Sequence, residues 1–369
     1  MATCATDGEN NERTASGDVA LPATFRKLVC TKLTPHFRDA VSIETVPMLK
    51  PGPQEILVRN RFAGINAGDV NKTAGRYNRA DKPPFNIGSE AVGEVVGVGS
   101  EVKNVKIGQG VCCYLEMGAF SEYQVIPAKL AIPVPSVKPE HLGLLLSGMT
   151  ADLSLRESGR IKEGETVLVT AAAGGTGQFA VQYAKLAGCH VIGTCSSDSK
   201  VEFLKGLGCD RPINYKTEDL GQVLTKEYPA GVDVVFECVG GEMFHTCLHN
   251  LAAKGRLIVI GFISGYKASQ IVAPTIQPEE TFRLLGKSAS VTAFLLFTFA
   301  DQWQESCARQ AALFAKGAIK VGVDRGQNSE RGAFKGVESI VDAIDYMYSG
   351  KSQGKLVVEV NGPLPSPGL

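Results

Sequence analysis

A run of small residues between an apolar strand and a helix carries the strongest chemical signal in the chain. Residues 166–170 are β-branched and apolar without a helical period, which is typical of a buried parallel strand. The run 172–177 then reads A-x-G-x-x-G, with Ala in place of the first Gly of a dinucleotide fingerprint. Such a turn brings backbone N–H groups and a helix N-terminus to a pyrophosphate. We predict dinucleotide binding by Ala172, Gly174, Gly175, Thr176 and Gly177; the alternative is a structural turn that binds nothing.

The residues after the next strand indicate which dinucleotide binds. An NAD-selective site places a carboxylate there to accept hydrogen bonds from the ribose 2′-hydroxyl. This chain has Cys195 at that place, followed by Ser196, Ser197 and Lys200. Hydroxyls and an ammonium suit a 2′-phosphate, and Tyr215, just past the following strand, could close over the same group. The pattern predicts NADPH; the alternative is a serine helix cap beside a surface lysine.

Length and composition limit the class of protein. The chain has 369 residues, 44% of them hydrophobic, which suffices for a large core and suggests two domains. Its 38 basic and 38 acidic residues give no net field that would attract nucleic acid or an anionic membrane. No apolar run approaches the ~18 residues that indicate a membrane span. Ten cysteines without a C-x-x-C motif predict free thiols in a reducing compartment.

The order of elements predicts an α/β fold with a doubly wound parallel sheet and a second, β-rich domain. Short segments separated by Gly and Pro before residue 147 predict a twisted, mostly antiparallel β domain. From residue 166, strands and helices alternate, with strands expected at 166–172, 190–195, 211–214, 232–236, 255–261 and 288–293. The stretch 317–360 is too small for a third domain, so we expect it to dock on the β domain. The predicted organisation is a disordered tail (1–20), a catalytic β domain (21–150 and 318–361) and a cofactor domain (151–317).

Further motifs occur in a characteristic order: GINAGD at 64–69, AGRY at 74–77, PPFNIGSE at 83–90 and GKSQGKLVV at 350–358. Together with the fingerprint they resemble the zinc-free quinone oxidoreductase branch of the medium-chain dehydrogenase/reductase superfamily, over nearly the whole chain. Segments 171–180, 189–197, 208–216 and 254–266 look more narrowly like its prostaglandin reductases. The resemblance implies a Rossmann sheet that binds NADPH and a GroES-like β domain.

The resemblance also implies an activity, which is the NADPH-dependent reduction of the carbon–carbon double bond of α,β-unsaturated ketones. The implied substrates are small apolar enones such as 15-oxo-prostaglandins, reduced at their 13,14 double bond. The alternatives are a quinone oxidoreductase, a 2-enoyl thioester reductase, and a non-enzymatic NADPH-binding structural or regulatory protein. We expect a homodimer formed through strand 288–293, without a nucleic-acid partner. The family often ends in a peroxisomal Ser-Lys-Leu, which this chain lacks, so we expect the cytoplasm.

Several site residues are carried over from the resemblance. Cofactor contacts are implied at Thr176, Ser196, Lys200, Tyr215, Ile260, Tyr266, Phe294, Leu295, Leu296 and Ser352. Cys238 stands at a further cofactor position, where the family more often has Ser, and Ser352 stands where it more often has Asn. Zinc-dependent relatives have Cys in place of Asn66 and His in place of Ser89, so we expect no metal. His245 and His249 could share a helix face, but without a third ligand in view we expect a solvated face.

Without a metal, hydride transfer to the β-carbon of an enone moves charge to the carbonyl oxygen, which then needs hydrogen-bond donors. Tyr266, on the loop after the fifth strand, is the first candidate, unless it only packs between the domains. Asn66 is the second, with a turn residue as the alternative, and Tyr77 is the third, more a wall than an acid. We expect no single side chain to be an obligatory proton donor. An aromatic pocket, or else an interdomain core, is expected from Phe62, Phe85, Phe262, Phe294 and Phe297.

Overall fold

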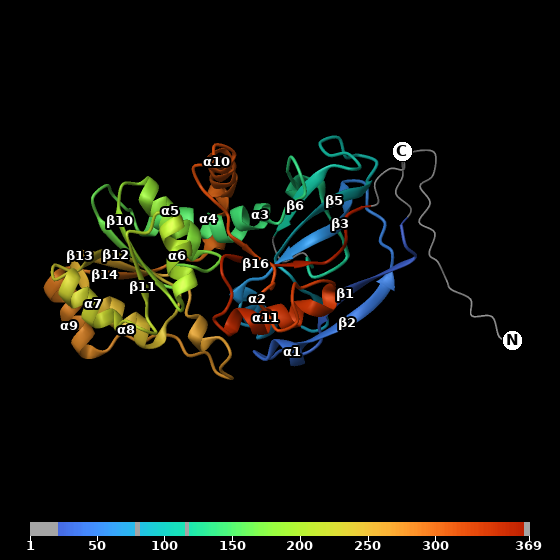
Figure 1. Ribbon diagram of the computed structural model, residues 1–369. Coiled ribbons are helices and arrows are strands. Elements are labelled where there is room, and N and C mark those ends of the chain that lie inside the picture. The colour runs from blue at the N-terminus through green and yellow to red at the C-terminus, as the bar shows by residue number, and fades with distance from the viewer. Residues whose placement is uncertain (1–20, 78–81, 115–117, 365–369) are drawn as a thin grey trace.

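Figure 1 shows a chain with two lobes, one built on a parallel sheet and the other on curled, mostly antiparallel strands. The computed structural model describes residues 21–77, 82–114 and 118–364. The tail expected at 1–20 therefore lies outside the described residues, as do residues 365–369. Within the described ranges, no helix is long and apolar enough to cross a membrane.

The parallel lobe contains a six-stranded sheet in the order β11-β10-β9-β12-β13-β14. Its strands are β9 (Thr166–Val169), β10 (His190–Cys195), β11 (Arg211–Asn214), β12 (Val232–Glu237), β13 (Leu251–Val259) and β14 (Ser290–Ala293). Its helices are α5 (Gly177–Leu186), α6 (Asp198–Gly206), α7 (Leu220–Glu227), α8 (Gly241–His249) and α9 (Pro278–Lys287). The predicted doubly wound parallel sheet is confirmed. Its strand order reverses between β9 and β12, and the carboxyl ends there form the crevice where ligands of such sheets bind.

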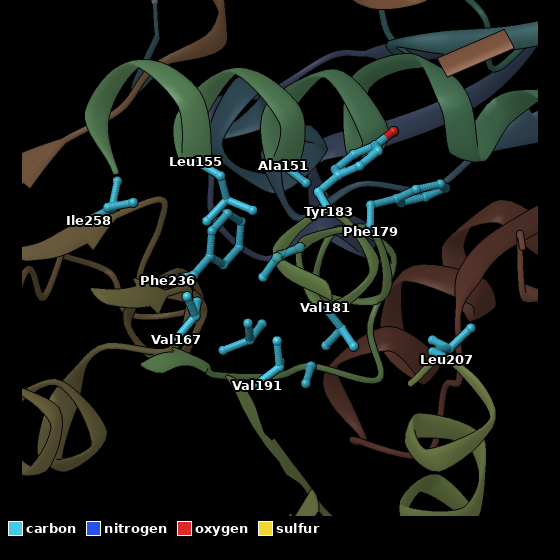
Figure 2. Packing of buried hydrophobic residues seen from close by; sticks show 14 of the residues in the cluster. Ala151, Leu155, Val167, Phe179, Val181, Tyr183, Val191, Leu207, Phe236 and Ile258 are labelled. Atoms are coloured by element: carbon cyan, nitrogen blue, oxygen red, sulfur yellow. The ribbon is translucent and has the colours of Figure 1, made fainter. Parts of the chain in front are cut away.

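The core of this lobe forms because its strands are apolar on both faces. Figure 2 shows Val167 of β9, Phe236 of β12 and Leu155 of a connecting helix turned toward one another on one face. The next strand residue, Leu168, points to the opposite face and packs there in a cluster with Phe244 of α8. The sheet is therefore covered by helices on both sides, which fixes the position of its carboxyl edge.

Helical segments connect the lobes along one side (Figure 1). They are α3 (Glu140–Leu142), the π-helical η2 (Gly143–Ser147), α4 (Gly148–Leu153) and the π-helical η3 (Ser154–Ser158), and they are packed against η5 (Leu296–Gln302) and α10 (Trp303–Ala315). The apolar sequence of residues 141–155 predicts a helix leading into the cofactor domain, and the segment is helical but broken into α and π turns. An ion pair between the buried Asp152 and the partly exposed Arg309 joins α4 to α10, and Ser306 donates to the same carboxylate at 2.6 Å.

The β lobe contains a sheet in the order β15-β16-β3-β5-β6-β8, with β7 also paired to β3, and a sheet in the order β2-β1-β4. Its strands are β1 (Thr24–Cys30), β2 (Val41–Pro47), β3 (Glu55–Gly64), β4 (Phe85–Asn86), β5 (Glu90–Val98), β6 (Gly110–Tyr114), β7 (Tyr123–Pro127), β8 (Ile132–Pro133), β15 (Val323–Asp324) and β16 (Lys355–Glu359). Its short helices are α1 (Phe37–Ala40), α2 (Ala67–Thr73), η1 (Ala128–Leu130), η6 (Val337–Ser339) and α11 (Ile340–Tyr348). Most neighbouring strands are antiparallel, as predicted.

Strand β16 brings the end of the chain back to the lobe where the described chain begins. Its residues 357–359 pair antiparallel with residues 62–64 of β3, so the predicted docking of this segment on the β lobe is confirmed. The same segment reaches the other lobe, because the N–H of Gly354 donates to the carbonyl of Ala173 at 2.8 Å. The fingerprint turn and β16 are therefore in direct contact, and Lys355 lies at their junction.

Candidate cofactor and active site

The fingerprint turn brings the start of α5 close to the end of β9. A Cβ at Gly177 would lie 2.7 Å from the Cα of Ala172 and would also collide with the carbonyl of Ala171. Two hydrogen bonds hold the turn to β10: Ala171 N–H donates to Thr194 Oγ1 at 3.2 Å, and Ala172 N–H donates to the Thr194 carbonyl at 2.9 Å. Glycine at 177 is therefore a packing requirement of the turn.

The N-terminus of α5 opens onto this turn. Its N-cap residue, Thr176, makes no side-chain capping bond. The first N–H groups of a helix have no intrahelical acceptor, and they carry a partial positive charge. Together with the glycine positions 174 and 175, this arrangement fits a pyrophosphate group, which supports the prediction for residues 172–177.

Ser196 and Lys200 meet at the end of β10, as the sequence predicted. Lys200 Nζ donates to Ser196 Oγ at 3.2 Å and to the Gly350 carbonyl at 2.6 Å, and Ser196 Oγ donates to the same carbonyl at 3.1 Å. The Lys200 side chain is buried, and desolvation lowers its pKa. Because both of these acceptors are neutral oxygens, an anionic ligand would be a stronger partner for the ammonium. A 2′-phosphate fits this place.

Ser197 and Tyr215 lie beside this pair without joining it. Ser197 is the N-cap of α6, where its Oγ accepts the N–H of Lys200 at 3.4 Å, so the helix-cap alternative holds for this residue. Tyr215 is 44% exposed, and its N–H donates to the carbonyl of Cys195 at 3.1 Å. Its backbone therefore lies at the carboxyl end of β10, and its role in covering a bound group stays a prediction. Ser352 follows two residues after Gly350, whose carbonyl holds Lys200.

The remaining predicted cofactor positions follow the carboxyl ends of β12, β13 and β14. Cys238 and Ile260 are partly buried, and their N–H groups donate to Thr170 Oγ1 and to the Glu237 carbonyl, each at 2.8 Å. The side chains of Phe294 and Leu296 are in the core, at 6% and 7% exposure. Leu295, between them, is 47% exposed. Of these three residues, only Leu295 offers much side-chain surface to a ligand.

Tyr266 is held at the carboxyl edge of the sheet by groups from both lobes. Its hydroxyl accepts the N–H of Phe262 at 3.2 Å and hydrogen-bonds the side chain of Asn71 on α2. Arg76, just after α2, donates to the Tyr266 carbonyl at 2.7 Å and to Asn71 Oδ1 at 3.0 Å. Burial raises the pKa of Tyr266, so the hydroxyl keeps its proton at neutral pH. The arrangement presents an oriented hydrogen-bond donor.

Asn66 lies among buried charges at the start of α2. Its Oδ1 accepts from Lys355 Nζ at 2.7 Å, and its Nδ2 donates to Glu90 Oε1 at 2.9 Å. Glu90 and Lys355 form an ion pair with 0% and 1% exposure. The second Nδ2 hydrogen has only a longer contact, 3.4 Å, with the Gly64 carbonyl. The donor role predicted for Asn66 is therefore limited to this one N–H.

Tyr77, the third predicted candidate, stands against α2. A Cβ at Gly68 would lie 3.0 Å from the Tyr77 hydroxyl, and the tyrosine is 47% exposed. Residues 78–81, which follow it, lie outside the described ranges. Its role as a wall of the site stays a prediction.

Models of known families match both lobes. The alcohol dehydrogenase GroES-like domain matches residues 52–136, and the zinc-binding dehydrogenase family matches residues 175–325. A prostaglandin reductase-3 from Mus musculus is 54% identical to this chain, over 94% of this chain and 92% of the relative. The chain belongs to the prostaglandin reductase-3 family. This family has the architecture of quinone oxidoreductase-like medium-chain dehydrogenases/reductases, so the predicted resemblance and the GroES-like lobe are confirmed.

Two other relatives place this chain within the wider group. A probable quinone oxidoreductase from Leishmania amazonensis is 43% identical over 92% of this chain and 99% of its own length. The solved structure of Escherichia coli quinone oxidoreductase complexed with NADPH matches with a TM-score of 0.77 at 29% identity. That match covers 90% of this chain and 99% of the bacterial one. The chain is thus an oxidoreductase of this type along nearly its whole length.

The phenylalanines predicted to line one pocket do not form one cluster in this member of the family. Phe62 is in the core of the β lobe, and Phe294 is in the core of the parallel lobe, where it stacks on Phe299 at 4.9 Å. Phe262 packs edge-on against Tyr266 at 5.1 Å. Phe62 and Phe294 are buried in the cores of separate lobes, which fits neither the shared pocket nor the interdomain core that was expected of them.

His245 and His249 have a partner that the sequence did not indicate. The carboxylate of Glu280 on α9, 1% exposed, lies 2.6 Å from His245 Nδ1 and 3.2 Å from His249 Nε2. The predicted solvated face is therefore wrong for His245, which is paired with α9, and holds better for His249, which is 41% exposed. Among the residues that the structure describes, no group of three or more His, Cys, Asp or Glu could hold a metal ion.

The sequence analysis assigned no role to three residues that the structure places in the candidate site, namely Glu90, Lys355 and Arg76. Lys355 begins a strand in which Val357 is fully buried, and side chains two residues apart share a face. This alternation was a usable signal that Lys355 also points inward. Glu90 and Arg76 lie in the motifs PPFNIGSE and AGRY, but no local pattern indicated that they pair with Lys355 and with the loop of Tyr266.

Asp69, beside Asn66, yields a pH prediction. Burial raises the pKa of this carboxyl to about 7, although it accepts hydrogen bonds from Ser89 Oγ at 2.7 Å and Asn66 N–H at 2.8 Å. Because the folded pKa lies above the unfolded value, folding favours the protonated form, and this contribution is lost as pH rises toward 7. Between pH 5 and 8 the unfolding free energy of the wild type should therefore fall by roughly 1–3 kcal/mol more than that of Asp69→Asn.

Urea unfolding at both pH values measures this difference. Asp39→Asn, which removes an exposed carboxylate from the same lobe, is the matched control and should follow the wild type. Equal pH slopes for the wild type and Asp69→Asn would contradict a titration of Asp69 in this range.

Proposed function

We propose that this chain is an NADPH-dependent reductase of α,β-unsaturated ketones, with 15-oxo-prostaglandins, reduced at their 13,14 double bond, as its substrate class. The observation that carries the proposal is the oriented, protonated hydroxyl of Tyr266 at the same sheet edge as the fingerprint turn. The name of the Mus musculus relative, a prostaglandin reductase-3, supports this substrate class. The NADPH complex of the Escherichia coli relative supports the cofactor.

Each part of the cofactor has residues that suit it. The turn at 174–177 and the N-terminus of α5 would hold the pyrophosphate, and Ser196 with Lys200 would hold the 2′-phosphate. Tyr215 would cover the adenosine end, and Leu295 would line the nicotinamide end. When bound, NADPH supplies the hydride.

The protein's own residues would then stabilise the charge that develops on the substrate carbonyl oxygen. The Tyr266 hydroxyl accepts the N–H of Phe262 and hydrogen-bonds Asn71, whose Oδ1 already accepts from Arg76. With the Asn71 amide nitrogen as the donor in that bond, the hydroxyl proton would be free to donate to the substrate oxygen. Arg76 ties the loop of Tyr266 to α2, so the donor needs little reorganisation. The α-carbon of the product can take its proton from water, in keeping with the expectation that no side chain is an obligatory proton donor.

Removing this hydroxyl tests its role. Tyr266→Phe should lower turnover of an enone by roughly 10- to 1000-fold, because one donor to the developing oxyanion is lost. Steady-state kinetics with NADPH consumption measures the effect. The control is Tyr228→Phe, which removes a hydroxyl that bonds His190 at 2.9 Å on the far side of the lobe. Full turnover by Tyr266→Phe would remove this residue from the mechanism.

A comparison of three substrates separates the proposed function from its alternatives. NADPH consumption is measured with a 15-oxo-prostaglandin, a naphthoquinone and a crotonyl thioester under the same conditions. Highest kcat/KM for the prostaglandin supports the proposal, whereas highest kcat/KM for either other substrate favours the corresponding reductase. Tight NADPH binding without turnover of any substrate would favour a structural or regulatory protein.

We also infer that the predicted domains, 21–150 with 318–361 and 151–317, are the working units, and that two copies associate through the cofactor domain. Strand β14 ends the order of the parallel sheet, and α9 beside it exposes Phe282 and Leu285 at 75% and 74%. Sedimentation velocity should give about twice the chain mass of 39.2 kDa. The variant Phe282→Glu/Leu285→Glu should sediment as one chain, and a wild type that sediments as one chain would contradict the dimer.

A further inference from the structure

The buried ion pair between Lys355 and Glu90 forms the floor of the site at the junction of the lobes. Lys355 Nζ also donates to the Ile65 carbonyl at 3.2 Å and to Ser147 Oγ at 3.4 Å, while Glu90 Oε2 accepts the N–H of Leu146 at 3.3 Å. The pair therefore joins β16, β5, the chain before α2, and the connecting segment η2. Such a pair needs further hydrogen bonds to offset the loss of water, and these contacts supply them.

The pair also borders the fingerprint turn. A Cβ at Gly175 would lie 3.5 Å from Lys355 Cδ and 3.3 Å from Ser147 Oγ, so the stem of the lysine runs beside the turn. Asn66, which both charges contact, is only partly buried. The lysine stem thus links the Asn66 amide to the fingerprint turn.

The two charges allow the Asn66 amide only one of its two flipped orientations. In the observed orientation the carbonyl oxygen faces the ammonium and the amide nitrogen faces the carboxylate. A rotation by half a turn would place the NH₂ group against the ammonium and the oxygen against the carboxylate, where neither can form a hydrogen bond. The ion pair therefore fixes the direction of the second Nδ2 hydrogen, whose present contact with the Gly64 carbonyl is 3.4 Å.

We propose that Lys355 and Glu90 are positioning residues that hold the Asn66 amide with this one N–H ready to donate to the ligand carbonyl or carboxamide. The proposal rests on the proposed reductase function. The ion pair acts through Asn66, so its contribution to catalysis disappears when the amide is absent. A purely structural ion pair would instead contribute in the same way with or without the amide.

A double-mutant cycle separates these two roles. Removing Lys355 or Glu90 singly would leave an unpaired buried charge, so both are replaced by neutral side chains of similar shape in Lys355→Met/Glu90→Gln. We expect this variant and Asn66→Ala each to lower kcat for the enone by roughly 10- to 100-fold, with the NADPH Kd within about threefold of the wild type. The triple variant should have about the kcat of Asn66→Ala alone.

Two further measurements test whether a fall in kcat comes from the amide orientation or from a general loss of stability. The control Arg256→Met/Glu165→Gln removes another ion pair, at 10% and 20% exposure in the parallel lobe, and should leave kcat near the wild type. In the ligand-free protein labelled with ¹⁵N-asparagine, the Asn66 side-chain resonances, assigned by their loss in Asn66→Ala, should shift or broaden in Lys355→Met/Glu90→Gln. Both readouts distinguish amide orientation from a general loss of stability.

The outcomes are decisive in each direction. Any one of three results would overturn the proposal. They are a wild-type kcat in Lys355→Met/Glu90→Gln, unchanged Asn66 resonances in that variant, and a triple variant that is slower than Asn66→Ala by the same factor by which the double variant is slower than the wild type. A wild type that turns over no enone would instead contradict the proposed function, and the resonances would then decide the positioning role alone.

Discussion

Replacing Lys200 with alanine is expected to raise the Kd for NADPH by about 10- to 100-fold while hardly changing the Kd for NADH. In the structure this ammonium is buried and donates to Ser196 and to a backbone carbonyl, both neutral. A 2′-phosphate would replace these contacts with charge-assisted hydrogen bonds, which are worth roughly 1.5–3 kcal/mol. NADH has no such phosphate, so its affinity does not depend on the ammonium.

Fluorescence titration with both cofactors measures this difference in the same preparation. Lys205→Ala is the matched control, because Lys205 lies on the same helix but is exposed and paired with Glu202 at 2.8 Å. The control should bind both cofactors like the wild type. If Lys200→Ala weakened NADH as much as NADPH, the lysine would be supporting the fold of the site rather than recognising the phosphate.

The second large effect is expected from Gly177→Ala. The added Cβ would meet the Ala172 backbone at 2.7 Å, and neither the strand end nor the helix can yield without moving the turn. Overpacking of this kind costs typically about 1–3 kcal/mol, which corresponds to a fall in Tm of roughly 2–12 °C for a lobe of this size. Because the displaced turn is also the pyrophosphate site, NADPH should no longer raise the Tm.

Thermal unfolding with and without NADPH checks both parts of this expectation. The control is Gly206→Ala at the end of α6, where a new Cβ would have no atom within 4 Å. That variant should keep the wild-type Tm and its increase with NADPH. Stabilisation of Gly177→Ala by NADPH to the same degree as the wild type would show that the turn does not contact the cofactor.

The parallel sheet could be predicted because its strands and helices each carry a local signal. The segment 190–195 is an apolar run that was predicted with its observed bounds, and β13 was placed only in part. The first residues of β13 pair with Val232, before a register shift near Val234. A short stretch of sequence cannot reveal this shift, because it depends on the neighbouring strand. The helix predicted at 141–155 is also broken into π turns. It packs closely on α10, and a local sequence pattern cannot reveal such a long-range contact.

The cofactor end of the site was predictable for the same reason, and the catalytic end was not. Ser196 and Lys200 are four residues apart at a helix start, so their meeting follows from local geometry. Tyr266 was a candidate by its place on the sheet edge, but its tie to Arg76 spans 190 residues of sequence. Glu90 and Lys355 were missed because a charged residue is normally expected to be exposed. Only the fold shows that the two charges lie beside each other in the interior.

The contact between β16 and β3 has a consequence for biosynthesis. Lys355 Nζ reaches the carbonyl of Ile65, 290 residues earlier in the chain, so the floor of the site can form only after both of these distant segments have been translated. A nascent chain that stopped before β16 could complete the parallel sheet yet would keep Glu90 without its counter-ion. Products that terminate before β16 would therefore carry an unneutralised carboxylate at the position where the complete site has an ion pair.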